Sequence, residues 1–150
     1  MKLLSGGQTG VDRAALDVAL ALDIPCGGWC PRGRKAEDGA IPDRYPLAET
    51  PSPEYAQRTA LNVRDSDATL ILTRGEPSGG TALTIDIAQQ RKKPCFVVDL
   101  DDRPDVSVVQ RWLREQNIQV LNVAGPRESQ SPGIGTAAAL FLQQILPGCS

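Results

Sequence analysis

The chain opens with a short apolar run, a glycine-rich turn and an alanine-rich helical pattern, and this combination constrains the fold more than any other feature. Residues 2–4 predict a short buried strand, the turn covers residues 5–10, and apolar spacing predicts a helix from about 11 to 22. A strand that leads through a tight turn into a helix leaves unpaired N–H groups at the start of the helix. These groups and the helix dipole favour an anion. We therefore expect residues 5–10 to form one wall of an anion-binding cleft.

The order of strand and helix recurs along the whole chain. The further strands and helices are predicted, in alternation, at residues 24–29, 53–65, 68–73, 81–91, 95–100, 104–116, 120–123 and 133–146. The run at 68–73 is apolar and unbroken, as expected for a central parallel strand. In the strand predicted at 24–29, Pro25 can open the strand or lie on an edge but cannot sit in the middle of a ladder. This alternation predicts a three-layer α/β fold, with a mainly parallel sheet of about five strands and helices on both faces.

Three glycine-bearing turns follow the first, third and fifth predicted strands, at residues 5–10, 78–81 and 124–129. The carboxyl ends of parallel strands share one edge of the sheet, and ligands bind at that edge. Hydroxyl, amide and guanidinium side chains near the turns add donors to the backbone N–H groups. The candidate ligand-binding residues are Ser5, Gly6, Gly7, Gln8, Thr9, Gly10, Arg13, Lys35, Arg74, Ser78, Gly79, Gly80, Thr81, Gly125, Arg127 and Ser129.

Each turn also has a purely structural interpretation. The first matches neither the G-x-G-x-x-G pattern nor a P-loop, so it could be a plain tight turn. Ser78 and Thr81 could simply cap a helix. Arg127 could hold an oxyanion bidentately, or it could form a solvated pair with Glu128. A single anion site therefore requires that the three turns converge in space.

A long polar segment follows Trp29 and is expected to stay irregular as far as Pro53, because five prolines interrupt it, at residues 31, 42, 46, 51 and 53. Its charges, together with Trp29 and Tyr45, favour an ordered lid over a linker. The charged side chains could be merely solvated. Alternatively, Lys35 or Arg32 folds over the charge of a ligand.

Composition narrows the possible functions. The 150 residues, 41% of them hydrophobic, suit one domain over residues 1–150. A net charge of -2 and 4% aromatic residues argue against nucleic-acid binding. The apolar runs fall short of the roughly 18 residues that span a membrane, and the start lacks a signal-peptide pattern. We therefore expect a cytoplasmic protein that binds a small anionic ligand.

The chain has four cysteines and no histidine. A structural zinc site would need three or four of the thiols, including Cys149 near the end of the chain, so no structural metal is expected. The missing histidine removes Ser-His and Cys-His catalysis. Any acid–base chemistry would therefore use Asp, Glu, Lys, Tyr or Cys side chains. The acids expected nearest the cleft are Asp12, Asp43, Asp65, Asp67 and Asp86.

Several motifs, in order along nearly the whole chain, resemble the molybdenum cofactor carrier family. They read SGGQTGVDRAALD at 5–17, GGWCPRGRKAEDG at 27–39, NVRDSDAT at 62–69, SGGT at 78–81 and NVAGPRES at 122–129. The resemblance implies a Rossmann-like fold that binds and carries molybdenum cofactor or molybdate without catalysis. It also implies that the protein forms a homo-oligomer, either a dimer or a tetramer, and that it interacts with molybdenum enzymes or cofactor-synthesis proteins. The cofactor, a phosphorylated pterin dithiolene with an oxo-molybdenum centre, is anionic at both ends and suits a cleft with glycine turns and arginines.

The same family belongs to a wider superfamily that includes cytokinin-activating phosphoribohydrolases. Those relatives carry a Pro-Gly-Gly-x-Gly-Thr-x-x-Glu motif, from which residues 78–86 depart at Ala82, Leu83 and Asp86. These departures weaken the case for hydrolysis. Two alternatives to a carrier remain open, namely a nucleotide or phosphoribosyl hydrolase that uses Asp86, and a nucleotide sensor that binds without turnover.

Overall fold

The computed structural model describes residues 1–146, so Cys149 lies outside the described part of the chain. Five parallel strands form the main sheet in the order β2-β1-β9-β7-β8. Their bounds are β1 Lys2–Leu4, β2 Cys26–Gly27, β7 Ala68–Thr73, β8 Cys95–Asp99 and β9 Val120–Ala124. All six residues of β7 are buried, as its unbroken apolar run predicts for a strand covered on both faces. The predicted parallel sheet is confirmed, with the short β2 at one edge.

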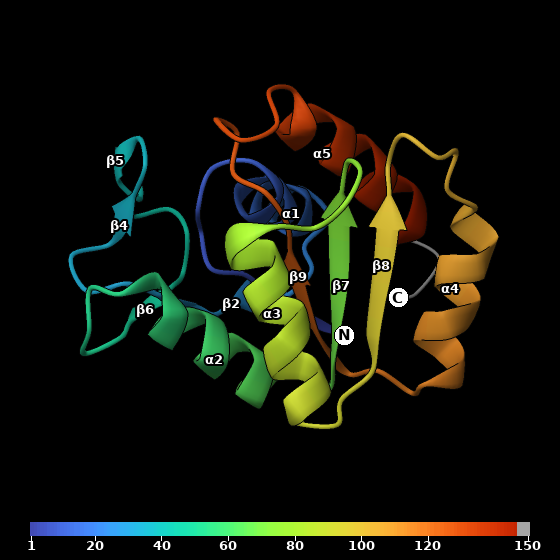
Figure 1. Cartoon of the computed structure of the whole chain (residues 1–150), viewed down its shortest axis with the longest axis horizontal. Helices are drawn as coiled ribbons and strands as arrows, with labels where there is room; N and C mark the ends of the chain where they lie inside the picture. The colour runs from blue at the N-terminus through green and yellow to red at the C-terminus, as the bar shows by residue number, and fades with distance from the viewer. Residues whose placement is uncertain (147–150) are drawn as a thin grey trace.

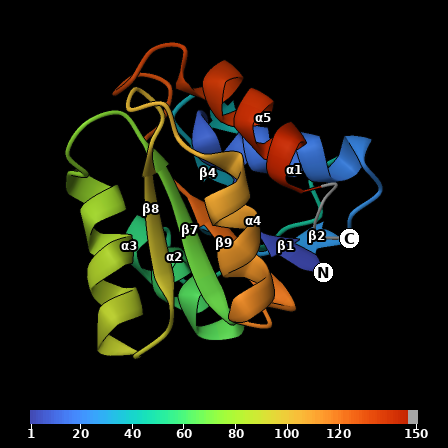
Figure 2. The ribbon, with the colours of Figure 1, turned by 90° about the vertical axis from the view of Figure 1, so that its right-hand side faces the viewer.

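Helices cover both faces of the sheet, which confirms the predicted three-layer α/β fold (Figures 1 and 2). One layer holds α1 (Val11–Ala21), α4 (Val106–Glu115) and α5 (Ile134–Ile145), and the other holds α2 (Tyr55–Asp65) and α3 (Gly79–Gln90). α1, α4 and α5 turn apolar side chains toward the sheet and join the core cluster. The buried residues of α2 and α3 are mostly polar, namely Asn62, Val63, Thr81, Thr84 and Ala88. Within residues 1–146, no helix combines the length and the apolar character needed to cross a membrane.

The strand order places the three glycine-bearing turns side by side. β1, β9 and β7 are neighbours, and these are the strands that the three turns follow. Leu4 at the end of β1 pairs with Asn122, and Ile71 of β7 pairs with Ala124 at the end of β9. All three turns therefore leave the same edge of the sheet from adjacent strands.

The segment between β2 and α2 is ordered, and the expectation that it stays irregular to Pro53 is wrong. It contains a parallel pair, β3 (Trp29–Cys30) with β6 (Ala48–Glu49), and an antiparallel hairpin, β4 (Lys35–Ala36) with β5 (Gly39–Ala40). The hairpin projects to the left of the sheet in Figure 1. Arg34 organises this lid because its guanidinium donates to the backbone carbonyls of Ile41, Pro42, Tyr45 and Leu47. Sequence periodicity could not reveal such a side chain as the centre of a fold.

Three predicted helix starts shift by two residues in the structure, since α4 begins at Val106 and not at residue 104. α2 was expected from residue 53, but it begins at Tyr55, and the Ser52 hydroxyl accepts the Glu54 N–H at 3.0 Å. Ser52 thus shapes the turn before the helix. α3 begins at Gly79, earlier than the expected Thr81, with Ser78 at the cap position.

Gly10 joins the first turn to the third through a backbone contact. Its φ is 80°, and a Cβ at this position would lie 2.4 Å from the carbonyl oxygen of Pro126 and 2.8 Å from the nitrogen of Glu128. The next residue, Val11, donates its N–H to the same Pro126 carbonyl at 3.3 Å. Only glycine allows this approach and this φ together.

We expect Gly10→Ala to lower the free energy of unfolding by roughly 2–4 kcal/mol, because the methyl group adds a clash with the third turn to the cost of positive φ. Gly33→Ala is the matched control, since Gly33 has a φ of 85° and open space around it. That change is expected to cost about 1 kcal/mol. Urea unfolding measures both, and equal losses in the two variants would contradict the role of the contact.

Candidate functional site

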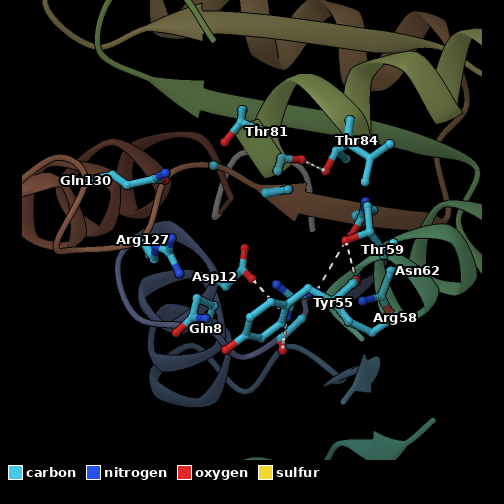
Figure 3. Close-up of a pocket in the computed structure, with 17 residues that line it drawn as sticks. Gln8, Asp12, Tyr55, Arg58, Thr59, Asn62, Thr81, Thr84, Arg127 and Gln130 are labelled. Carbon is cyan, nitrogen blue, oxygen red and sulfur yellow. Dashed lines mark hydrogen bonds and ion pairs between the residues drawn. The ribbon is translucent and has the colours of Figure 1, made fainter. Parts of the chain in front are cut away.

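A cavity of about 160 Å³ lies at the carboxyl edge of the sheet and opens to solvent (Figure 3). All three glycine-bearing turns line it, as the single-site interpretation requires. The predicted residues in its lining are Gly6, Gln8, Gly80, Thr81, Gly125 and Arg127. Its other walls come from α2 and α3 and from the end of β9.

Several predicted site residues do not line the cavity but stabilise the first turn. The buried Ser5 hydroxyl donates to the carbonyl of Asp12 at 2.8 Å and accepts the Gly7 N–H at 3.3 Å. Gly7 and Gly10 are also outside the lining, where Gly7 faces lid side chains and Gly10 touches the third turn. These residues hold the first turn in shape.

A second group faces the lid. Thr9 and Ser129 donate to the carboxylate of Glu37, and Arg13 donates to Asp38 with its Nη1 at 2.5 Å. Lys35 contributes no atom to the cavity lining, but its ammonium lies 4.9 Å from the ring centre of Tyr55, which does line the cavity. These side chains therefore surround the cavity without forming its wall.

The remaining predicted residues lie near the second turn. Ser78 and Gly79 precede the lining residues Gly80 and Thr81 at the start of α3. Arg74 is outside the lining: its guanidinium donates to the Pro132 carbonyl at 3.1 Å and lies 3.4 Å from Asp101. The turns thus converge as predicted, but only part of the predicted set faces the cavity.

One face of α2 supplies lining residues that sequence reasoning missed. Tyr55, Arg58, Thr59 and Asn62 point toward the cavity from successive turns of the helix (Figure 3). Their spacing places them on a single stripe of α2. The sequence did contain a signal for these residues, because a helix that packs on a sheet is expected to have an apolar stripe, whereas this stripe of α2 is polar and aromatic.

Further lining residues come from several places in the chain, and those that were not predicted are Ala56, Leu83, Thr84, Asn122, Ala124 and Gln130. Asp12 also lines the cavity. Asp12 was expected near the cleft. Asn122 lies on β9, where its amide donates to the Thr69 hydroxyl at 3.3 Å. Gln130 follows the third turn and approaches Gly79 of the second.

Arg58 links α2 to the first turn. Its Nη1 donates to the carbonyl of Gly6 at 2.7 Å and lies 3.7 Å from a carboxylate oxygen of Asp12. A Cβ at Gly6 would lie 2.4 Å from the same guanidinium, so glycine is needed there for this approach. The ring of Tyr55 stacks near Arg58, with 5.3 Å from guanidinium carbon to ring centre.

Asp12 places a buried carboxyl against the cavity, at the first turn of α1. Burial raises its pKa from 3.8 to about 6, although Arg58, a backbone hydrogen bond from Gln8 and, to a smaller degree, Arg13 act in the opposite direction. The group therefore exchanges a proton near neutral pH. A cavity that holds such a carboxyl together with Arg58 and Arg127 can adjust its charge to that of a ligand.

The described residues offer no evident metal centre. Within residues 1–146, no group of three or more cysteine, aspartate or glutamate side chains could hold a metal ion. Cys26, Cys30 and Cys95 are free thiols, and burial raises the pKa of each. The polar groups of the cavity are thus hydroxyls, amides, guanidinium groups and one carboxyl.

We expect Arg58→Gln to raise the pKa of Asp12 above its value of about 6, since the opposing cation is removed. Arg13→Gln, the matched control, should raise it less. Carbon-detected NMR titration of the Asp12 carboxyl measures both shifts. An unchanged or lower pKa in Arg58→Gln would contradict the proposed interaction.

The raised pKa also has a consequence for stability. Between about pH 4 and pH 6 the folded chain binds more protons at Asp12 than the unfolded chain. The contribution of Asp12 to the free energy of unfolding is therefore fully present below about pH 4 and is lost as the pH rises through about 6. Asp12→Asn should remove this component from the pH dependence measured by urea unfolding.

Comparison with known proteins agrees with the fold and the motifs. A family model described as the circularly permutated YpsA SLOG family matches residues 3–146. Among solved structures, the crystal structure of a "putative molybdenum carrier protein" from Syntrophus aciditrophicus SB is 48% identical, with a TM-score of 0.92 and with 97% of this chain and 94% of that chain covered. The search of curated proteins finds no significant match. The resemblance inferred from the motifs is confirmed, and the chain belongs to the circularly permutated YpsA SLOG family.

Proposed function

We propose that the chain binds molybdenum cofactor or molybdate in the cavity and carries it without chemical change. The observation that carries this proposal is the convergence of the three glycine-bearing turns on one cavity. Such turns at the carboxyl ends of parallel strands supply N–H donors to anions. The 48% identical structure, described as a molybdenum carrier, supports the same ligand class.

In this proposal the anionic group of the ligand lies between the second and third turns. Gly80 and Thr81, in the first turn of α3, line the cavity where a helix N-terminus favours negative charge. Arg127 also lines the cavity and can bind an oxyanion through two N–H groups. Arg58 supplies a second positive charge from α2.

Other lining groups suit the pterin ring. Tyr55 offers an aromatic face, and the amides of Asn122 and Gln130 can hydrogen-bond to ring edges. The amide of Asn62 is already used, because it binds the N–H and the carbonyl of Trp29 at 2.8 and 3.0 Å and so fixes β3. Asn62 therefore positions the lid, and we assign recognition of the pterin ring to the amides of Asn122 and Gln130.

The size of the cavity bears on how a large ligand would sit. Its volume of about 160 Å³ is below the roughly 300–1,000 Å³ of pockets that enclose drug-sized ligands. Molybdate would fit inside, whereas the whole cofactor would leave one end in the open mouth. Lys35, held over Tyr55 by the lid, is placed to meet the charge of that end.

The remaining implications of the resemblance are part of the same proposal. We propose that the protein is cytoplasmic and forms a dimer or tetramer. It would exchange its cargo with molybdenum enzymes or cofactor-synthesis proteins. Light scattering of the purified protein tests the oligomeric state.

We expect the purified wild-type protein to bind molybdate or molybdenum cofactor in calorimetric titration, and Arg58→Ala to weaken that binding roughly tenfold or more. The loss follows because the cavity then keeps the Asp12 carboxyl without its cation. Arg111→Ala removes the same charge from an exposed position on α4 and should bind as the wild type does. A folded wild type that binds neither ligand would reject the carrier proposal, as would equal affinities of the two variants.

One observation favours a hydrolase as the second candidate function. Asp12 is a cavity carboxyl with a pKa of about 6, which suits a general acid or base at neutral pH. Asp86, the acid expected from the sequence, is instead exposed on α3 and does not line the cavity. The hydrolase hypothesis therefore moves from Asp86 to Asp12.

If the chain is a nucleotide or phosphoribosyl hydrolase, it should release free base from nucleoside monophosphates. Asp12→Asn should then lower the rate by roughly a hundredfold or more, while Asp86→Asn leaves it unchanged. Chromatographic assay of released base measures both. Absence of release by the wild type rejects the hydrolase, and nucleotide-dependent thermal stabilisation without release would identify a sensor.

A further inference from the structure

Each of three arginines at the cavity is paired with a carboxylate. Arg58 lies 3.7 Å from Asp12, Arg127 lies 3.7 Å from Glu37, and Arg13 lies 2.5 Å from Asp38. An anionic ligand that uses one of these guanidinium groups must therefore share it with a carboxylate or displace that carboxylate. Which acid can move decides where the anion binds.

The three acids differ in how firmly they are held. Asp12 sits in the first turn of α1, and its side chain is 8% exposed. Glu37 and Asp38 form the tip of the β4–β5 hairpin, whose strands have two residues each, and their side chains are 21% and 48% exposed. The hairpin acids are therefore the displaceable ones.

The carboxylate of Glu37 is held as a bound anion would be. It accepts hydrogen bonds from the Thr9 hydroxyl, from the Ser129 N–H at 3.2 Å and from the Ser129 hydroxyl at 2.5 Å, and Arg127 lies beside it. These donors come from the first and third turns. The hydrogen bonds from Ser129 and Thr9 lower the pKa of Glu37, so they favour its negative charge.

The same donors border the cavity. Arg127 lines it, and Gln8, which also lines it, accepts the Glu37 N–H with its Oε1 at 2.9 Å. The Glu37 carboxylate thus occupies a position at the edge of the cavity that an anion could take over. A tetrahedral dianion offers more oxygens and more charge to these donors than a carboxylate does.

We propose that Thr9, Ser129 and Arg127 form an oxyanion subsite at the mouth of the cavity, which Glu37 fills until a tetrahedral oxyanion of the ligand displaces it. The subsite rests on the proposed function for its ligand, whose oxyanion is either a phosphate monoester or an oxo-molybdenum group. Displacement removes the contacts of the Glu37 carboxylate and leaves the hairpin tip held by the Glu37 N–H on Gln8 and by the Arg13–Asp38 pair. Entry of the ligand therefore loosens the lid.

The decisive variant is Glu37→Ala, which removes the competing carboxylate and leaves the donors. Calorimetric titration with inorganic phosphate and, separately, with molybdate should show affinity raised roughly fivefold or more for at least one of them. A gain for phosphate alone identifies the phosphate end of the ligand, and a gain for molybdate alone identifies the metal end. Asp43→Ala removes the same charge from a fully exposed position in the lid and should change neither affinity.

Two further measurements distinguish an anion subsite from a contact of Glu37 that only stabilises the hairpin. Ser129→Ala added to Glu37→Ala should reverse the gain, because it removes a hydroxyl donor. Saturating oxyanion should speed hydrogen exchange of the hairpin amides, residues 35–40, in the wild-type chain. Unchanged or weaker binding by Glu37→Ala overturns the proposal, and so does hairpin exchange that the oxyanion leaves unchanged.

These experiments distinguish failure of the proposed subsite from failure of the proposed carrier function. Cofactor bound by the wild type, with oxyanion affinity unchanged in Glu37→Ala, would keep the carrier and reject the subsite. A gain in phosphate affinity in a chain that binds no molybdenum compound would keep the subsite and reject the carrier.

Discussion

Close backbone contact between the glycine-bearing turns is the constraint on which the site depends. Gly10 meets the Pro126 carbonyl, and a Cβ at Gly125 would lie 2.2 Å from the carbonyl of Leu72. The first turn is thereby fixed to the third, and the third to the end of β7. A side chain at either glycine would separate strand ends that must adjoin to line one cavity. The sheet order alone brings the turns near, and the glycines bring them into contact.

The charges at this edge of the sheet are balanced within the chain. Arginines from α1, α2 and the third turn face carboxylates from α1 and from the lid. Burial of Asp12 and hydrogen bonding of Glu37 shift their pKa values in opposite directions, so one acid is poised to gain a proton and the other to keep its charge. In the proposed mode of binding, an anionic ligand exchanges with carboxylates already present, and the lid takes part in that exchange.

Much of the fold was predictable, because alternating apolar runs and helical stripes are local patterns. The run at 68–73, the five strands and both helix layers follow from such patterns, as do the three turns that line the cavity. An ordered lid was expected, but its short strands were not, because they depend on Arg34, which donates to carbonyls 7 to 13 residues away, and on the buried Tyr45, whose hydroxyl donates to Asp17. The site was predictable in part: Gly80 and Arg127 line the cavity, whereas Arg13 and Ser129 bind lid acids.

The sequence by itself determined the fold class, the family and the edge of the sheet at which the turns gather, since each depends on residue order and spacing. Only the tertiary structure decided the strand order, the contribution of α2 to the cavity and the choice of Asp12 over Asp86 as the cavity acid. It also decided that the Glu37 carboxylate accepts hydrogen bonds from Thr9 and Ser129. These features arise from packing and charge pairing between segments far apart in the chain, such as Thr9, Glu37 and Ser129, which no local pattern records.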